Sequence, residues 1–146
     1  MKFLWDTNIL LNRLRHTDKF AEMNRIHQFL SSKNQVFLSV ISIGEIESIA
    51  YQNNWGAAKW TQLQEMIEGT SQVEIFEETI HAYAKIDAFS QGKLAGKPLP
   101  KGISARNMGK NDLWLAATAH IGQFKFATTD LDFNHLHGTF IDLIQV

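Results

Sequence analysis

Residues 3–11 read FLWDTNILL, and this stretch holds a short apolar run, an acid and the beginning of a second apolar pattern. The run Phe3-Leu4-Trp5 is typical of a parallel strand that is buried on both faces. Ile9, Leu10, Leu11 and Leu14 then predict a short helix directly after the strand. A strand that passes straight into a helix favours a parallel α/β sheet, with Asp6 at the junction of the two elements.

The rest of the chain repeats this alternation of strand and helix. We expect strands at residues 3–5, 36–40, 73–76, 124–128 and 140–146, and helices at 9–14, 18–30, 42–52, 57–68, 77–91 and 111–121. Thr17 or Asp18 is a plausible N-cap of the second helix, and Gly69 is expected to end the fourth. The pattern predicts an α/β protein with a central parallel sheet of about five strands, as a single domain over residues 1–146.

Composition excludes several classes of protein. The 146 residues include no cysteine, which rules out a disulfide framework and a thiolate zinc site and is compatible with the cytoplasm, the expected location. No apolar run has the length of a signal peptide or a membrane span, so no membrane association is expected. A net charge of −1 argues against tight, non-specific binding of nucleic acid through basic residues alone. Bound cations can still supply positive charge locally.

Four acids fall where a parallel sheet places its functional sites. Asp6 and Asp130 follow the first and fourth expected strands, and Glu45 lies in the first turn of the helix after the second. Asp112 begins the helix that follows a long loop. Sites in such sheets form outside the carboxyl ends of the strands. Four carboxylates brought together repel one another, and divalent Mg²⁺ or Mn²⁺, which prefer oxygen ligands, would relieve that repulsion.

The segments around these acids resemble the motifs of a known family. They are residues 3–8 (FLWDTN), 43–46 (IGEI), 111–117 (NDLWLAA) and 128–133 (TTDLDF). Together, and in this order, they are similar to the four motif blocks of PIN domains, most of all those of VapC-like toxins from bacterial toxin–antitoxin pairs. The resemblance spans residues 3–133, which is nearly the whole chain.

The resemblance implies a three-layer α/β/α PIN-like fold and a Mg²⁺- or Mn²⁺-dependent endoribonuclease. It implies that Asp6, Glu45, Asp112 and Asp130 are the catalytic, metal-binding acids, and that Asn8 and Thr129 support them. Many relatives carry Arg where this chain has Thr129, so a basic contact to the substrate is in doubt at that position. The resemblance also implies an RNA substrate, a cognate antitoxin protein and a homodimer. The helices of residues 18–68, with Trp55 and Trp60, are the candidate dimer surface.

Several of these residues have a purely structural alternative. Ser42 and Glu45 have the spacing of a capping box, in which Glu45 would bond the helix N-terminus instead of a metal. Asn111 and Asp112 could be an N-cap and a partner of the helix dipole. Asp132 could be an outer ligand or a helix cap. Three histidines suggest a zinc site only weakly and are interpreted as solvated or capping residues: His120, His135 and His137.

A basic segment precedes Asp112. Residues 88–111 contain no Asp or Glu but 5 of the 14 Lys and Arg residues, together with both prolines. The candidates for RNA binding are Lys97, Lys101, Arg106 and Lys110 in this segment and Arg13 near Asp6. Such a long, glycine- and proline-containing connection is either a solvated loop or a functional one that leads RNA phosphates to the acids.

Three other functions remain as alternatives to a toxin ribonuclease. A PIN nuclease could serve housekeeping RNA processing without an antitoxin, and a PIN-like module could bind RNA or protein without catalysis. The latter class has usually lost one or more acids, whereas all four are present in this chain. An aspartyl phosphatase would need Asp-x-Asp after the first strand, and Asn8 at the second of these positions argues against it.

Overall fold

The computed structural model describes residues 1–146 and has a five-stranded, all-parallel sheet at its centre. The strands are β1 (Lys2–Trp5), β2 (Gln35–Ser39), β3 (Ser71–Val73), β4 (Lys125–Thr128) and β5 (Asp142–Gln145). Their order across the sheet is β3-β2-β1-β4-β5. The chain therefore builds outward from β1 in both directions, and the strand order reverses between β1 and β4.

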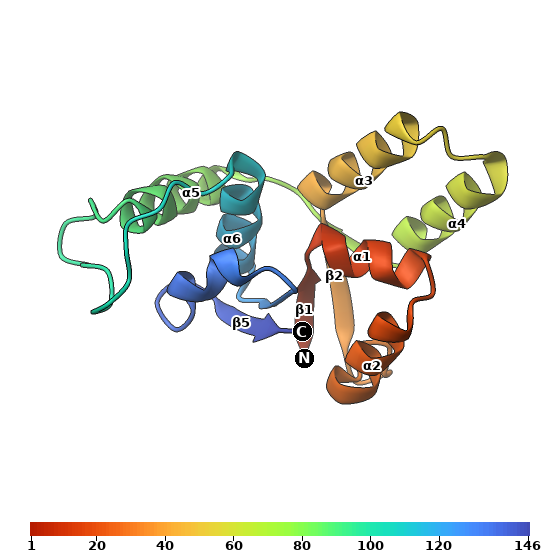
Figure 1. Cartoon of the computed structure of the whole chain (residues 1–146), viewed down its shortest axis with the longest axis horizontal. Helices are drawn as coiled ribbons and strands as arrows, with labels where there is room; N and C mark the ends of the chain where they lie inside the picture. Colours follow the sequence, from red (N-terminus) through yellow and green to blue (C-terminus); the bar gives the residue numbers. More distant parts are fainter.

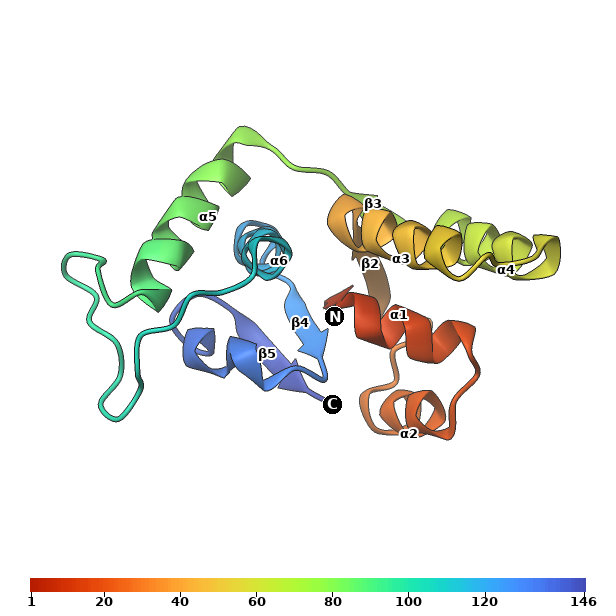
Figure 2. The ribbon, with the colours of Figure 1, turned by 45° about the horizontal axis from the view of Figure 1, so that its top comes forward.

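Helices cover both faces of this sheet (Figure 1). They are α1 (Thr7–Leu14), α2 (Asp18–His27), α3 (Val40–Gln52), α4 (Ala57–Glu68), α5 (Glu77–Ser90), α6 (Lys110–Gly122) and the short 3₁₀ helix η1 (Leu131–Leu136). The first four pack on one face, and α5, α6 and η1 on the other (Figures 1 and 2). No helix combines the length and apolar character needed to cross a membrane. The expected three-layer α/β/α architecture is confirmed.

Strand β1 explains the two separate cores. Its side chains alternate, so Phe3 and Trp5 enter the core beneath α1–α4, whereas Leu4 enters the core beneath α5 and α6. All three are at most 1% exposed. Burying an apolar side chain of this size stabilises the fold by about 1.5–3 kcal/mol. The apolar run that opens the chain therefore joins all three layers.

Two expected elements differ from the structure. The strand expected at residues 73–76 is wrong in position, because β3 pairs with β2 through Ser71–Val73 and the chain then leaves the sheet. The second helix ends at His27 instead of continuing to residue 30. Gln28 takes a left-handed conformation with φ of 53°, which stops the helix. The 3₁₀ helix η1 after Asp130 was not expected from the sequence.

The start of α3 differs from the capping box that the sequence suggested between Ser42 and Glu45. Ser39, not Ser42, is the N-cap, and its hydroxyl accepts a hydrogen bond of 3.2 Å from the amide of Ile41. Ser42 lies inside the helix, so the capping box between Ser42 and Glu45 is wrong, and the Glu45 side chain is free for another role. At the start of α2, Thr17 accepts a 3.0 Å bond from the amide of Phe20, which confirms the expected cap.

Ser39→Ala is expected to lower the free energy of unfolding by about 1 kcal/mol, because it removes the only side-chain cap of α3. Ser42→Ala is the matched control: the Ser42 hydroxyl is buried without a hydrogen-bond partner, so its removal leaves nothing unpaired. Urea unfolding of both variants checks this, and an equal loss of stability in the two would contradict the assigned cap.

The basic segment forms a long irregular loop between α5 and α6. No helix or strand lies between Ser90 and Lys110, as expected. The loop extends away from the sheet on the side of α5, so its tip lies far from α1 (Figures 1 and 2). The end of the loop leads into α6, and the first turn of this helix carries Asp112.

Candidate active site

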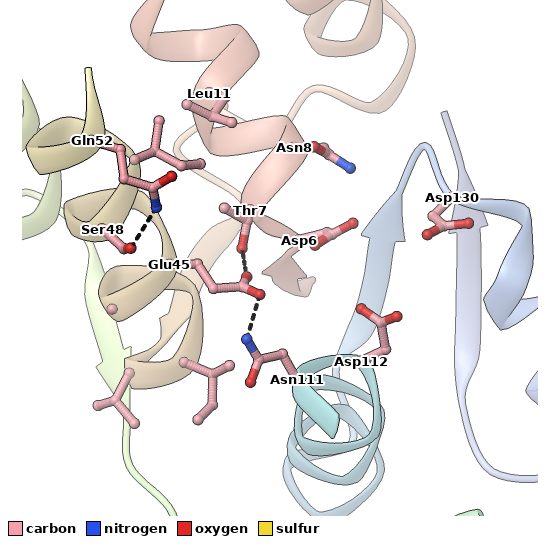
Figure 3. Close-up of a pocket in the computed structure, with 14 residues that line it drawn as sticks. Asp6, Thr7, Asn8, Leu11, Glu45, Ser48, Gln52, Asn111, Asp112 and Asp130 are labelled. Atoms are coloured by element: carbon pink, nitrogen blue, oxygen red, sulfur yellow. Dashed lines mark hydrogen bonds between the residues drawn. The ribbon is translucent and has the colours of Figure 1, made fainter. Parts of the chain in front are cut away.

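An open cleft of about 660 Å³ lies at the carboxyl edge of the sheet, beside the point where the strand order reverses. Parallel sheets form their sites at this position because the connections that follow the two neighbouring strands run to opposite faces of the sheet and leave a crevice between them. The lining residues are Asp6, Thr7, Asn8, Leu11, Val40, Ile41, Gly44, Glu45, Ser48, Ile49, Gln52, Asn111, Asp112 and Asp130. The four acids singled out in the sequence are all among them (Figure 3).

Asp6 lies deepest in the cleft, at the end of β1, and is only 6% exposed. Its amide donates to the carbonyl of Ala127 on β4, which holds the residue at the junction of the two central strands. Its carboxylate accepts a 2.6 Å hydrogen bond from the Thr128 hydroxyl. Burial raises the pKa of Asp6 despite this bond, and the charges of Glu45 and Asp130 act in the same direction.

Glu45 joins three helices. It projects from α3, and its carboxylate accepts hydrogen bonds from the Thr7 hydroxyl on α1 and, at 2.7 Å, from the Asn111 amide on α6 (Figure 3). Asn111 is therefore not an N-cap, and the residue in that position is Gly109. Both donors are neutral, so they orient the Glu45 carboxylate without neutralising its charge.

Asp112 lies in the first turn of α6, and this places it at the same edge as the strand ends. Burial, followed by the negative charges of Asp6, Asp130 and Glu45, raises the pKa of Asp112 to about 6. A carboxyl group that is half-buried among other acids is easier to protonate, because both its burial and the neighbouring charges disfavour its ionised form.

Asp130 follows β4 and is linked to Asp6 through Thr128. The Thr128 hydroxyl donates to Asp6 and accepts a 2.9 Å bond from the amide of Asp130. The Asp130 carboxylate caps η1 by accepting from the amide of Asp132 at 2.9 Å. The hydroxyl that supports the acids is that of Thr128, whereas its neighbour Thr129 does not line the cleft. Sequence reasoning missed Thr128 because two adjacent threonines give no sign of which one turns inward, and it missed Thr7 because its partner Glu45 lies 38 residues away in the sequence.

None of the four cleft acids forms an ion pair with a basic side chain. The three ion pairs of the chain join Arg25 to Glu22, Arg106 to Asp132 and Lys125 to Asp142, and none involves a cleft acid. At their present side-chain positions, no three acids or histidines converge closely enough to ligate one ion together. The donor set nevertheless fits a hard divalent cation, since it consists of carboxylates that repel one another and form no ion pair with a basic side chain.

The supporting residues expected around the acids are only partly brought together. Asn8 lines the cleft on α1. Asp132 lies outside it, in a smaller neighbouring cavity that it shares with Arg106 and Asp112. There the Arg106 guanidinium is 3.7 Å from the Asp132 carboxylate and donates to its backbone carbonyl.

The candidate RNA-binding residues are also spread apart. Lys110 borders the acids, in a small cavity with Glu45, Asn111 and Asp112. Lys97 lies over the ring of Phe140, at 4.9 Å from its centre, and Lys101 is exposed in the loop. Arg13 lies over Trp5 and lines a different cavity, which residues of α1, α2 and α4 enclose.

The histidines have structural partners. His135 is 4% exposed and bonds to the Ser90 hydroxyl at 2.7 Å, so its interpretation as a solvated or capping residue is wrong. Its position in η1 turns it into the core beneath α5, which the sequence did not predict. His120 and His137 bond to the backbone at Phe140 and Leu143.

The raised pKa of Asp112 predicts a pH-dependent stability of the metal-free protein. Between its unfolded pKa and about 6, the folded state binds more protons at Asp112 than the unfolded state does, so stability falls as the pH rises. Asp112→Asn is expected to stabilise the protein by about 1 kcal/mol at about pH 7.5, after allowance for the half-exposed position of the side chain, and by little at about pH 4.5. Urea unfolding in EDTA at both pH values checks this. An equal gain in stability at the two pH values would contradict the raised pKa of Asp112.

Solved structures provide an independent comparison of the fold. The chain is similar to a structure of VapBC2 from Rickettsia felis bound to a promoter DNA fragment, with a TM-score of 0.75, 16% identity, and 99% of this chain and 98% of that chain covered. It is also similar to VapBC-1 from nontypeable Haemophilus influenzae, with a TM-score of 0.72, 20% identity, and 99% of this chain and 98% of that chain covered. A third similar structure is that of VapBC-5 from Mycobacterium tuberculosis, a member of the VapBC family of toxin–antitoxin systems. Its TM-score is 0.62, with 19% identity, and 99% of this chain and 98% of that chain covered.

At these identities the likeness establishes a shared fold over the full length of each chain. No curated protein sequence matches this chain. The family comparison is more direct, because it scores the chain against the pattern of a whole family. The family model described as PIN domain matches residues 3–138, a range that contains all four cleft acids, and the chain therefore belongs to the PIN domain family.

Proposed function

We propose that this protein is a Mg²⁺- or Mn²⁺-dependent endoribonuclease that hydrolyses RNA phosphodiester bonds, and that it is the toxin of a toxin–antitoxin pair. The observation that carries the proposal is the cleft itself. Four carboxylates from β1, α3, α6 and the end of β4 face one cavity and have no basic partner. Four negative charges attract divalent cations and repel the negative phosphodiester of RNA. A bound metal ion would therefore be needed before the RNA backbone can approach the acids.

The chain's own residues hold and orient this site. Asp6, Asp112, Asp130 and Glu45 would hold the ion or ions. Thr128 orients Asp6 through its hydroxyl, and Thr7 and Asn111 orient Glu45. When bound, the metal would lower the pKa of an attacking water and stabilise the charge on the phosphate oxygens. Lys110, at the border of the acids, is placed to contact an adjacent RNA phosphate.

The proposed partners rest on the structural neighbours. VapBC-5 is described as a member of a family of toxin–antitoxin systems, and this chain has the same fold over its full length. We infer an antitoxin partner and a homodimer, acting in the cytoplasm. The candidate dimer surface includes Trp55, which lies under the ammonium of Lys59 at 4.2 Å, and Trp60, which lies 5.0 Å from the ring of Tyr51.

The test is cleavage of a mixed RNA pool by the purified protein. Fragments are expected with Mg²⁺ or Mn²⁺ and not with EDTA, and a single-stranded DNA pool of matched sequence is the control for RNA preference. Cleavage that persists in EDTA would exclude the metal-dependent mechanism. Absence of cleavage of the mixed pool and of purified transfer, ribosomal and messenger RNA would reject the proposed activity.

Thr128→Val is expected to lower the cleavage rate by roughly 10- to 100-fold, the usual effect of removing a residue that orients a metal ligand. The variant keeps the shape of the side chain but loses the hydroxyl that bonds both Asp6 and the amide of Asp130. Thr129→Val, one residue further along the chain and outside the cleft, is the control and is expected to cleave at the parent rate. If Thr129→Val shows the larger loss, the assignment of Thr128 is wrong.

A further inference from the structure

The cleft has a second half that the proposed chemistry does not use. Beyond Glu45 it continues along α1 and α3 into a region that we name the distal arm, lined by Leu11, Ser48, Ile49 and Gln52. In Figure 3 Leu11, Ser48 and Gln52 lie on one side of Glu45, and Asp112 and Asp130 lie on the other. The two halves form one continuous cavity, so a ligand held at the acids can extend into the arm.

Helix geometry makes the arm a single surface. Ser48, Ile49 and Gln52 lie three, four and seven residues after Glu45, so the four residues share one face of α3. On α1, Leu11 lies one turn beyond Thr7, and Thr7 contacts Glu45. The floor of the cleft is therefore a strip that runs from the acids to the last turn of α3.

The chemistry of the arm differs from that of the acid half. None of its four residues is charged, so it offers no positive charge to a phosphate. Leu11 and Ile49 are half-buried and provide an apolar surface. Ser48 and Gln52 are exposed and provide neutral hydrogen-bonding groups. A flat, uncharged group with polar edges suits this combination, and a nucleobase of single-stranded RNA has that character.

The side chain of Gln52 is oriented so that it can form hydrogen bonds with such a group. Its amide nitrogen donates a 2.9 Å bond to the Ser48 hydroxyl, which orients the carboxamide (Figure 3). One N–H and the carbonyl oxygen of Gln52 remain without a partner in the protein. A carboxamide with a free donor and a free acceptor can bond two adjacent groups on a base edge at once.

Gly44 provides a separate observation in favour of a ligand over α3. It lies inside the helix, where glycine is less favourable than alanine, and it lines the cleft. A Cβ atom built at Gly44 would have no neighbour within 4 Å, so packing inside the protein does not explain why this position has no side chain. A close approach of the substrate backbone to the helix would explain it, because a side chain there would block that approach.

We propose that the distal arm binds the base of the nucleotide next to the scissile phosphate, with Gln52 as the residue that determines base preference and Ser48 as its positioning residue. The proposal rests on the proposed ribonuclease function. The base stacks on Leu11 and Ile49, and its edge bonds to the Gln52 carboxamide.

Sequencing of the ends produced from a random-sequence RNA pool tests the proposal. The parent is expected to prefer one base at one position beside the cut, and Gln52→Leu to reduce that preference by roughly tenfold or more. Gln64→Leu, on an exposed position of α4 outside the cleft, is the matched control and keeps the parent pattern. If Gln52→Leu cuts with the parent base preference, the proposal is overturned.

A second measurement does not depend on cleavage. Adenosine, cytidine, guanosine and uridine, which lack a phosphate for the acids to repel, are titrated into the metal-free protein and followed by NMR. The side-chain amide of Gln52 and the methyl groups of Leu11 and Ile49 are expected to shift with one nucleoside more than with the others. If the parent fails to cleave RNA but these signals shift, the ribonuclease proposal fails and the base site stands. If no nucleoside shifts them, the base site is rejected, and a protein segment becomes the better occupant.

Discussion

Asp6→Asn is expected to lower the rate of RNA cleavage by about a thousandfold, more than the loss expected from residues that only orient a metal ligand. Asp6 is the most buried of the four acids and lines the cleft together with the other three. An amide in its place carries no charge and ligates a divalent cation weakly, so the metal would lose one of its charged ligands. Single-turnover cleavage of a fixed RNA substrate measures this effect.

The same variant is expected to remain folded. Asparagine has the shape of aspartate, and its carbonyl oxygen can still accept the hydrogen bond from Thr128. Loss of a buried negative charge also relieves repulsion from Glu45 and Asp130. Asp142→Asn, at an exposed acid paired with Lys125, is the control for a general effect of removing one charge. Cleavage by Asp6→Asn at the parent rate would show that the assigned site is wrong.

Divalent metal is expected to raise the unfolding temperature of the parent protein. A ligand that binds only the folded state at about 100 times its dissociation constant adds about 2.7 kcal/mol of stability. In a chain of this size that corresponds to an increase of roughly 5–10 °C. Thermal unfolding with Mn²⁺ or Mg²⁺, compared with EDTA, measures the change without any substrate.

Variants of individual acids show whether the increase in unfolding temperature comes from metal bound in the cleft. Asp6→Asn and Asp112→Asn should both lose most of the increase, whereas Asp142→Asn should keep it. Lowering the pH to about 5 should also reduce it, because protonation of Asp112, whose pKa is raised to about 6, competes with the metal. An equal increase in all four proteins would mean that the metal binds outside the cleft.

Most of the fold could be predicted from the sequence, for a physical reason that residues 3–11 illustrate. Phe3-Leu4-Trp5 is apolar at every position because β1 is buried on both faces, and such a run is visible without any knowledge of its neighbours. The acids could be located for the same reason, since Asp6 and Asp130 follow strands that the apolar pattern already marks. The resemblance to PIN domains, which the family comparison confirms, rests on these same segments.

Errors arose where the outcome depends on contacts between distant residues. Ser39 and Ser42 are equally good caps by composition, and the pairing of β2 with its neighbours decides that the helix begins at Val40. The end of β3 depends on how far β2 extends beside it. His135 is buried because η1 packs beneath α5, and nothing in its local sequence indicates this.

The amino-acid sequence by itself determined the alternation of strands and helices and placed Asp6 and Asp130 at strand ends, because strand burial and strand ends leave a local pattern in the chain. Glu45 and Asp112 were assigned to the same site through the resemblance of their segments to PIN domains. Only the tertiary structure decided which neutral side chains orient those acids. Thr128 instead of Thr129 contacts Asp6, and Thr7 and Asn111 meet at Glu45, across 38 and 66 residues of sequence respectively. Hydrogen bonds over such separations depend on the relative placement of whole elements, and no periodicity within a single element records that placement.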